Sequence, residues 1–136
     1  MKTNQHLALL TVLLGGLASC TFYARNAETY QADTRSLVET RNSALKECYD
    51  GALEADENVS GTVVVNFTVE KKTGVIKGAA VDASSTAPES LSSCVIAGLE
   101  GLSLDPSDQR DGVATMTWSF EVGAASADAA ADSAES

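Results

Sequence analysis

Three cysteines and one histidine are the scarce side chains of this sequence that could carry nucleophilic, redox or metal chemistry. The cysteines are Cys20, Cys48 and Cys94, while the one histidine, His6, lies in an N-terminal segment that we expect to be removed. Without His6, the remaining chain has no imidazole for a catalytic triad, a general base or a metal ligand. Cys48 and Cys94 form an even pair, which in an exported chain is most simply a disulfide, because that compartment is oxidising. Two buried free thiols are the alternative, and a two-cysteine metal site would lack its other ligands. We therefore expect no catalytic residues, no metal and no cofactor in the mature chain.

The N-terminus has the order of a bacterial export signal that ends at a cysteine. Lys2 supplies a positive charge, and an uninterrupted run of apolar and small residues follows from Leu7 to Leu17. That run is shorter than the roughly 20 apolar residues of a membrane-spanning helix. It ends in Leu17-Ala18-Ser19-Cys20, the lipobox pattern in which the cysteine thiol accepts a diacylglyceryl group before cleavage. The sequence predicts that residues 1–19 are removed and that Cys20 becomes the lipid-bearing first residue. An ordinary signal peptide with a chance cysteine is the alternative.

The predicted mature chain, residues 20–136, is strongly acidic. It loses Lys2 and keeps all 19 acidic residues against 8 basic ones, so its net charge is −11. Such a chain is not expected to bind nucleic acid or an anionic membrane face through charge. Three aspartates at a spacing of three, Asp105, Asp108 and Asp111, could suggest a calcium loop. The glycine and the terminal glutamate of the full calcium pattern are missing, so a solvated acidic turn is the favoured interpretation.

The middle of the chain predicts a helix followed by two strands. Residues 34–55 contain no proline and place their apolar side chains on one stripe, which predicts an amphipathic helix. Residues 60–69 alternate apolar and polar side chains with the period of a half-buried strand. A Lys-Lys-Thr-Gly turn follows, and residues 75–83 predict a second strand. Because residue 64 is also a valine, the first strand has two partly apolar faces and is expected to be central.

The C-terminal half predicts a second helix and a last strand. Thr86-Ala87-Pro88-Glu89 has the residues of a helix start, with Thr86 as the cap, and the helix is expected to run to about Leu102. Residues 113–122 predict the last strand, so the folded domain is expected to span residues 34–122. Residues 20–33 are polar and weakly patterned, which predicts a tether from the lipid or the fraying start of the first helix. Residues 123–136, without a large apolar side chain, predict a disordered acidic tail.

Short stretches of this pattern are similar to those of one protein family. They are Cys48-Tyr49, Ser60-Gly61-Thr62-Val63-Val64-Val65-Asn66-Phe67-Thr68-Val69, Gly74-Val75, Val81-Asp82-Ala83-Ser84-Ser85, Cys94-Val95-Ile96 and Trp118-Ser119-Phe120. With the order helix, strand, strand, helix, strand and one cysteine in each helix, the chain resembles the C-terminal domain of the AgmX/PglI family of myxobacterial motility proteins. That domain is itself similar to the TonB C-terminal domain. The chain departs from the family after the second helix, where Leu102-Ser103-Leu104-Asp105-Pro106 stands in place of an aromatic pair followed by proline.

The resemblance implies an α+β fold with a three-stranded antiparallel sheet, both helices on one face and Cys48 bonded to Cys94. Topology rules favour the strand order two-one-three, because the second helix then returns the chain beside the central strand. That order leaves the last strand at an edge, where unpaired backbone groups can add a strand from a partner, as in TonB-like relatives. The candidate partner-binding residues of this edge are Val113, Thr115, Thr117 and Ser119. Coverage of the edge by the tail or the tether is the alternative.

The lipid signal and the resemblance together predict a function. We expect a non-enzymatic interaction module, held by its lipid on the periplasmic side of the outer membrane, that docks onto an envelope protein. Thr21 stands where an aspartate would favour retention in the inner membrane, so the outer membrane is the favoured location. A structural or stress-related envelope lipoprotein without a strand partner is the alternative. No nucleic acid and no small-molecule substrate are expected.

Overall fold

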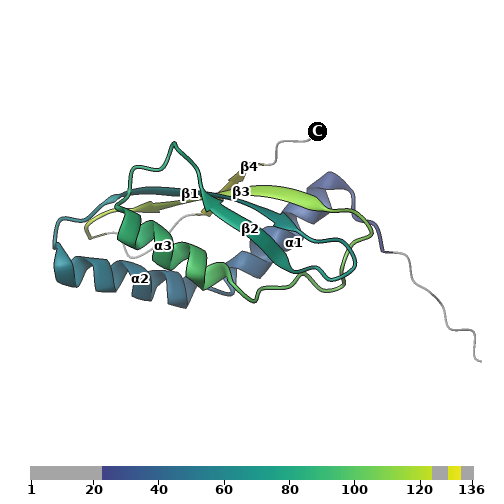
Figure 1. Cartoon of the computed structure of the whole chain (residues 1–136), viewed down its shortest axis with the longest axis horizontal. Coiled ribbons are helices and arrows are strands. Elements are labelled where there is room, and N and C mark those ends of the chain that lie inside the picture. Colours follow the sequence, from purple (N-terminus) through teal and green to yellow (C-terminus); the bar gives the residue numbers. More distant parts are fainter. Residues whose placement is uncertain (1–22, 124–128, 133–136) are drawn as a thin grey trace, which may run out of the picture.

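Four strands and three helices make up the described part of the chain, residues 23–123 and 129–132 of a computed structural model. The elements follow one another as α1 (Ala27–Glu39), α2 (Asn42–Ala55), β1 (Gly61–Val69), β2 (Ile76–Val81), α3 (Glu89–Leu99), β3 (Gly112–Phe120) and β4 (Ala129–Asp132). The strands form one antiparallel sheet in the order β2-β1-β3-β4, and Figure 1 shows α2 and α3 along one face of it. None of the described helices is long and apolar enough to span a membrane.

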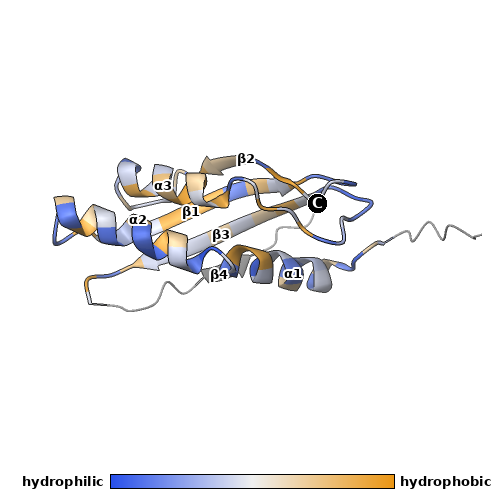
Figure 2. Ribbon diagram, turned by 90° about the horizontal axis from the view of Figure 1, so that it is seen from below, coloured by the Kyte–Doolittle hydropathy of each residue, from blue (hydrophilic) through white to orange (hydrophobic). Residues whose placement is uncertain are grey.

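The sheet confirms the predicted α+β layout and the order of the first three strands. β1 lies between β2 and β3, and it pairs with β3 in unbroken register from Gly61 opposite Phe120 to Val69 opposite Gly112. β-branched valine and threonine dominate β1, and such side chains suit a pleated surface. In Figure 2, which views the molecule from below, this central strand is coloured largely as apolar. The central position predicted for this strand from its two partly apolar faces is therefore confirmed.

The core lies between the sheet and its helices. The inward residues of β1 alternate strictly with half-buried ones, and those of β3 include Trp118, which is fully buried. The buried apolar residues of these elements are Val63, Val65, Phe67 and Val69 of β1, Ile76 of β2, Met116, Trp118 and Phe120 of β3, Val38 of α1, Leu45 and Tyr49 of α2, and Leu91, Val95 and Leu99 of α3. The last strand, predicted to run to residue 122, ends at Phe120, and Val122 is exposed.

The helix predicted over residues 34–55 is two helices with a break at Thr40 and Arg41. Their backbone N–H groups donate to the carbonyls of Leu37 and Val38, three residues back rather than four. The Thr40 hydroxyl also donates to the Leu37 carbonyl oxygen at 2.6 Å, a local bond that competes with regular helix geometry. The break lets α1 contact β3 and β4 while α2 packs against α3.

The predicted helix cap at Thr86 is also wrong. The cap residue of α3 is Pro88, and no side chain caps this helix. The Thr86 hydroxyl instead accepts a hydrogen bond from the backbone N–H of Thr62 at 2.9 Å, and the Thr86 N–H donates to the Thr62 carbonyl. The segment after β2 thus continues alongside β1. The Thr86 side chain bonds the backbone of β1 and does not cap the helix.

Of the two interpretations of residues 20–33, the start of the first helix holds from residue 27 onward. Arg25 is buried, and α1 begins at Ala27 with the Asn26 side chain accepting a hydrogen bond from the Thr29 N–H at 2.8 Å. The tether interpretation is wrong for Arg25, which contacts Asp108 far away in the sequence, a contact that local patterning does not register. Residues 20–22 lie outside the described part of the chain, as do the predicted signal 1–19 and the lipidation residue Cys20.

Candidate functional site

The four candidate edge residues lie together on one face of β3. Val113, Thr115, Thr117 and Ser119 alternate with the core residues, and they stand opposite Thr68, Asn66, Val64 and Thr62 of β1. Val113 and Ser119 are exposed, and Thr115 and Thr117 are half-buried. The face opposite the core therefore carries a row of hydroxyl, amide and small apolar side chains across two strands.

The backbone edge of β3 is partly occupied. β4 pairs antiparallel with it from Trp118 opposite Ala129 to Thr115 opposite Asp132. The sequence predicts a disordered tail over residues 123–136, and that prediction is wrong for 129–132, which form the fourth strand. Residues 124–128 and 133–136 lie outside the described part of the chain. Local sequence gave no sign of β4, because alanine is a poor strand former and the pairing comes from the neighbouring edge. The alternative that the tail covers this edge thus holds for the middle of β3.

A network of hydrogen bonds joins polar side chains on the face of the sheet opposite the core. The Thr115 hydroxyl donates to the side-chain oxygen of Asn66 at 2.6 Å, and the Asn66 amide donates to Asp82 at 2.8 Å. Asp82 also accepts hydrogen bonds from the hydroxyl and the backbone N–H of Ser84 at 2.7 and 2.9 Å. These bonds, above all those from Ser84, lower the pKa of Asp82. The outward positions of Asn66 and Thr115 on the predicted strands could have revealed the first bond, but not the others.

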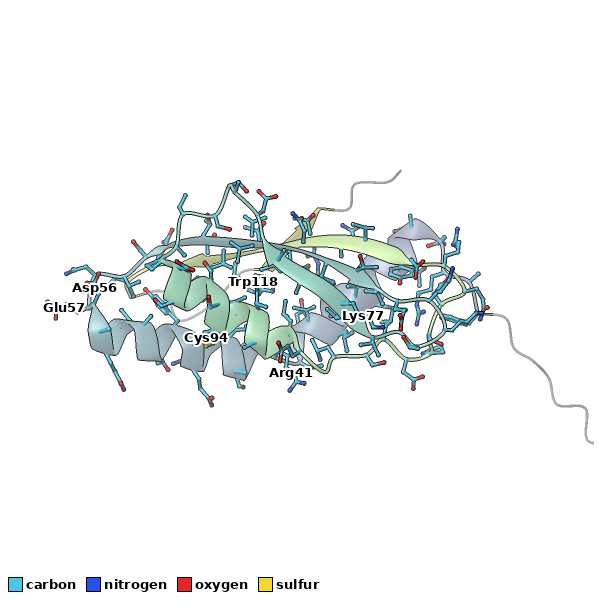
Figure 3. All side chains as sticks on the ribbon, viewed as in Figure 1. Arg41, Asp56, Glu57, Lys77, Cys94 and Trp118 are labelled. Carbon is cyan, nitrogen blue, oxygen red and sulfur yellow. A yellow bond between two sulfur atoms is a disulfide. The ribbon has the colours of Figure 1, made fainter. Side chains whose placement is uncertain are left out.

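The disulfide between Cys48 and Cys94 is present. It joins α2 to α3 with a Cα–Cα distance of 5.7 Å, inside the usual range, and closes a sequence separation of 46 residues. Cys94 is exposed and Cys48 is half-buried, so the bond lies at the outer side of the helix pair. Figure 3 shows Cys94 on the side of α3 that faces α2.

A buried charge cluster ties the start of the chain to the domain. The Arg25 backbone N–H donates to Asp108 at 2.7 Å, and its guanidinium donates to Asp33 at 2.5 Å and lies 3.9 Å from Asp108. The Arg25 and Asp108 side chains are each only 1% exposed. The guanidinium also lies over the Tyr23 ring, 4.4 Å from its centroid, and the Gln109 N–H donates to the Tyr23 carbonyl. The chain is therefore held on the domain from Tyr23 onward.

Three further contacts complete this cluster. The Arg110 guanidinium donates to the Arg25 carbonyl oxygen, and the Arg110 N–H donates to Asp108 at 3.0 Å. Gly112 lies directly against the Tyr30 ring, where a Cβ would have no room. Burial, followed by the negative charge of Asp108, raises the pKa of Tyr30. Sequence reasoning missed this cluster, because Arg25 and Asp108 are 83 positions apart and no local pattern connects them.

Asp108 is not part of a solvated acidic turn, so that interpretation of the three aspartates is wrong for it. Its oxygens accept backbone hydrogen bonds from two chain segments, whereas Asp111 is exposed and accepts the Lys71 N–H at 2.8 Å. Within the described residues no group of three or more His, Cys, Asp or Glu side chains is placed to hold a metal ion. Burial disfavours the charged form of Asp108, but the hydrogen bonds from Arg25, Arg110 and Gln109 outweigh it and lower the pKa.

The lowered pKa of Asp108 predicts a loss of stability in acid. Because the folded pKa lies below the unfolded value of about 3.9, the contribution of Asp108 is complete above that value. It is lost as the pH falls through the folded pKa. Chemical unfolding measured between pH 6 and pH 2 should show this loss, and Asp108→Asn should be less stable at neutral pH with a shallower acid slope. Equal acid slopes for the two proteins would contradict the assignment.

Comparison with known proteins identifies no relative of this chain. No protein-family model matches it, and no curated protein and no solved structure is significantly similar to it. The resemblance to the AgmX/PglI domain therefore stays a prediction.

Proposed function

We propose that this chain is a lipid-anchored, non-enzymatic binding module of the bacterial cell envelope that docks a partner by strand addition at β3. The lipobox before Cys20 supports the anchor and the export. A disulfide in the folded domain agrees with an oxidising compartment. The periplasmic side of the outer membrane remains the favoured location, on the identity of Thr21.

One observation carries the docking proposal: the β3 edge accepts an added strand, because it holds β4. The added strand is antiparallel and pairs only with residues 115–118, while β3 itself runs from Gly112 to Phe120. Gly112–Ala114 and Ser119–Phe120 have no partner on this edge within the described residues. A partner segment longer than β4 could therefore pair with more of β3 than β4 does.

The residues of β4 favour its replacement at the β3 edge by a strand from a partner. Its sequence is Ala129-Ala130-Ala131-Asp132, and alanine is depleted in strands because it offers little side-chain area to pack. A partner strand with β-branched or aromatic residues opposite Met116 and Trp118 would pair better at the same place. β4 thus pairs weakly with β3 and covers part of its edge until a partner strand that pairs more strongly replaces it.

Removing the tail is expected to increase capture of the partner. A photo-crosslinking residue at Thr117 or Ser119 in cells should trap one reproducible envelope protein, and a chain ending at Gly123 should trap more of it. If the β4 pairing is worth about 1 kcal/mol, the gain is about fivefold. A crosslinker at Asp50, exposed on α2, is the control and should trap none of it.

The alternative function predicts a different result. A structural envelope lipoprotein without a strand partner should give no specific adduct at Thr117 or Ser119, with or without the tail. Ser119→Pro distinguishes the two functions further, because proline removes a backbone hydrogen-bond donor of β3. It should abolish capture of the partner by the crosslinker at Thr117 only if the backbone of β3 binds that partner.

A further inference from the structure

The distance between Cys20 and the folded domain is short. Tyr23 is the first described residue, and its carbonyl already accepts a hydrogen bond from Gln109. Arg25 is locked between Asp33 and Asp108, as described above. Only Thr21 and Phe22 stand between Cys20 and Tyr23, and the three Cα–Cα steps from Cys20 to Tyr23 span at most about 10 Å when fully extended. A tether running to residue 33 would have reached more than about 40 Å.

The end of the molecule that receives this short link has a definite composition. It consists of residues 23–25, the turn 70–74 and the loop 105–111, here called the basal pole. Three hydrogen bonds join the turn to the loop: Lys72 N–H to the Asp108 carbonyl at 2.8 Å, Ser107 hydroxyl to the Lys72 carbonyl at 2.9 Å, and Lys71 N–H to Asp111 at 2.8 Å. Figure 1 shows α1 beginning at the same end as this turn.

Cations gather at the basal pole of an otherwise acidic protein. Four of the eight basic residues after Cys20 are here: Arg25, Lys71, Lys72 and Arg110. Arg25 is buried, while Lys71 and Arg110 are more than half exposed and Lys72 is exposed. Within the described residues no carboxylate forms an ion pair with the Lys72 ammonium group, and the Lys71–Asp111 pair is loose at 3.8 Å.

The acidic groups of this end are Glu70, Asp105, Asp108 and Asp111. Asp108 is buried against Arg25, and Glu70 is paired with Lys77 at 2.5 Å. The exposed charge of the pole is therefore close to balanced. The opposite end of the molecule carries Asp56 and Glu57, which Figure 3 places far from Lys77. The net charge of −11 is thus concentrated away from the basal pole.

We propose, on the premise of the proposed lipidation of Cys20, that the basal pole rests on the phospholipid headgroups of the leaflet that holds the acyl chains. The domain then has a fixed orientation, with the end of α2 and the start of β1 directed away from the bilayer. The attachment comes from the lipid, because a protein of this net charge is not drawn to an anionic surface. The local cations remove the repulsion that an acidic pole would meet there and offer donors to phosphate groups.

Arg25 is the residue that sets this orientation. Its two carboxylate partners come from α1 and from the loop 105–111, so it closes the link onto both. Without the contacts of Arg25 with Asp33 and Asp108, the residues before α1 would form a longer flexible linker. The domain could then take many orientations relative to the membrane.

The test compares two labels on the lipidated protein in phosphatidylethanolamine–phosphatidylglycerol vesicles. A fluorescent non-natural residue replaces Thr73 at the basal pole or Glu57 at the far end, and the vesicles contain headgroup-nitroxide lipid as the quencher. We expect loss of most of the emission at Thr73 and almost none at Glu57, because nine-residue strands put about 30 Å between the two ends. Equal quenching of the two labels would overturn the proposal.

A variant that leaves the domain intact provides the control. A flexible Gly-Ser insert of twelve residues between Thr21 and Phe22 adds a root-mean-square reach of about 20 Å and touches no described contact. It should remove most of the difference between the two labels. An unchanged difference would show that the orientation does not depend on the short link, against the proposal.

The mass of the intact protein purified from cells tests the lipidation of Cys20 separately from the orientation of the domain. If protein from cells carries no acyl group at Cys20, the lipoprotein assignment fails. The same two labels can then be read on residues 20–136 coupled through Cys20 to a maleimide phospholipid, and the orientation is decided there by the same criterion.

Discussion

Replacing Cys48 and Cys94 with serine is expected to lower the free energy of unfolding by about 4 kcal/mol. The disulfide closes a separation of 46 residues, and the chain-entropy model gives this value for a loop of that length. Cys94 is exposed and Cys48 half-buried, so the serine pair loses little burial and the effect comes from the cross-link. For a domain of about 100 residues, the unfolding midpoint should fall by about 15 °C or more.

Thermal and urea unfolding followed by circular dichroism measure this effect. Ser93→Ala, an exposed change beside Cys94, is the control and should shift the unfolding free energy by less than about 0.5 kcal/mol. A reducing agent should destabilise the native protein by the same amount and leave the double-serine variant unchanged. A loss of less than about 1 kcal/mol would mean that the disulfide does not constrain the unfolded chain.

Breaking the Arg25–Asp108 pair from one side is expected to cost about 3–5 kcal/mol. Both side chains are almost fully buried. Arg25→Met removes the buried cation beside Asp108 and Asp33, and Asp108→Asn removes the carboxylate that accepts the backbone N–H groups of residues 25 and 110. Arg25→Met and Asp108→Asn should each be strongly destabilising, and the double variant should lose less than the sum of the two. Urea unfolding of the four proteins measures the coupling.

The matched control is an ion pair of the same kind on the surface. Lys46 and Asp50 lie one turn apart on α2, 2.6 Å from each other, and their side chains are 64% and 53% exposed. Lys46→Met and Asp50→Asn should each cost no more than about 0.5 kcal/mol, because water screens this pair. If Asp108→Asn costs no more than Asp50→Asn, the buried cluster does not stabilise the fold.

The sequence was sufficient for those elements whose pattern is local. The alternation of β1 and β3, the order of the first three strands and the pairing of the two cysteines were all predicted. They follow from side-chain period, crossover rules and the even cysteine count, none of which needs distant contacts. The face on which Thr115 and Thr117 lie was predictable for the same reason.

The predictions that were wrong share a different cause. In each of them the conformation depends on contacts between residues far apart in the sequence. Arg25 is ordered by Asp108, a residue 83 positions away, and Ala129–Asp132 is a strand only because β3 lies beside it. The same holds for Thr86, whose hydroxyl serves β1 instead of a helix. In each case local propensity is weak, and tertiary contact decides the conformation.

The disulfide between α2 and α3 also has a mechanical consequence. If Cys20 is lipidated and a partner binds β3, as proposed, a pulling force between the two would follow the covalent chain from Cys20 to Cys48. It would then cross the sulfur bridge to Cys94 and continue to Gly112. The residues between the two cysteines, which include the whole of β1 and β2, are bypassed. Under such a load the protein could lengthen by about 160 Å less than the reduced chain, since the 46 Cα–Cα steps between the two cysteines are withheld from extension.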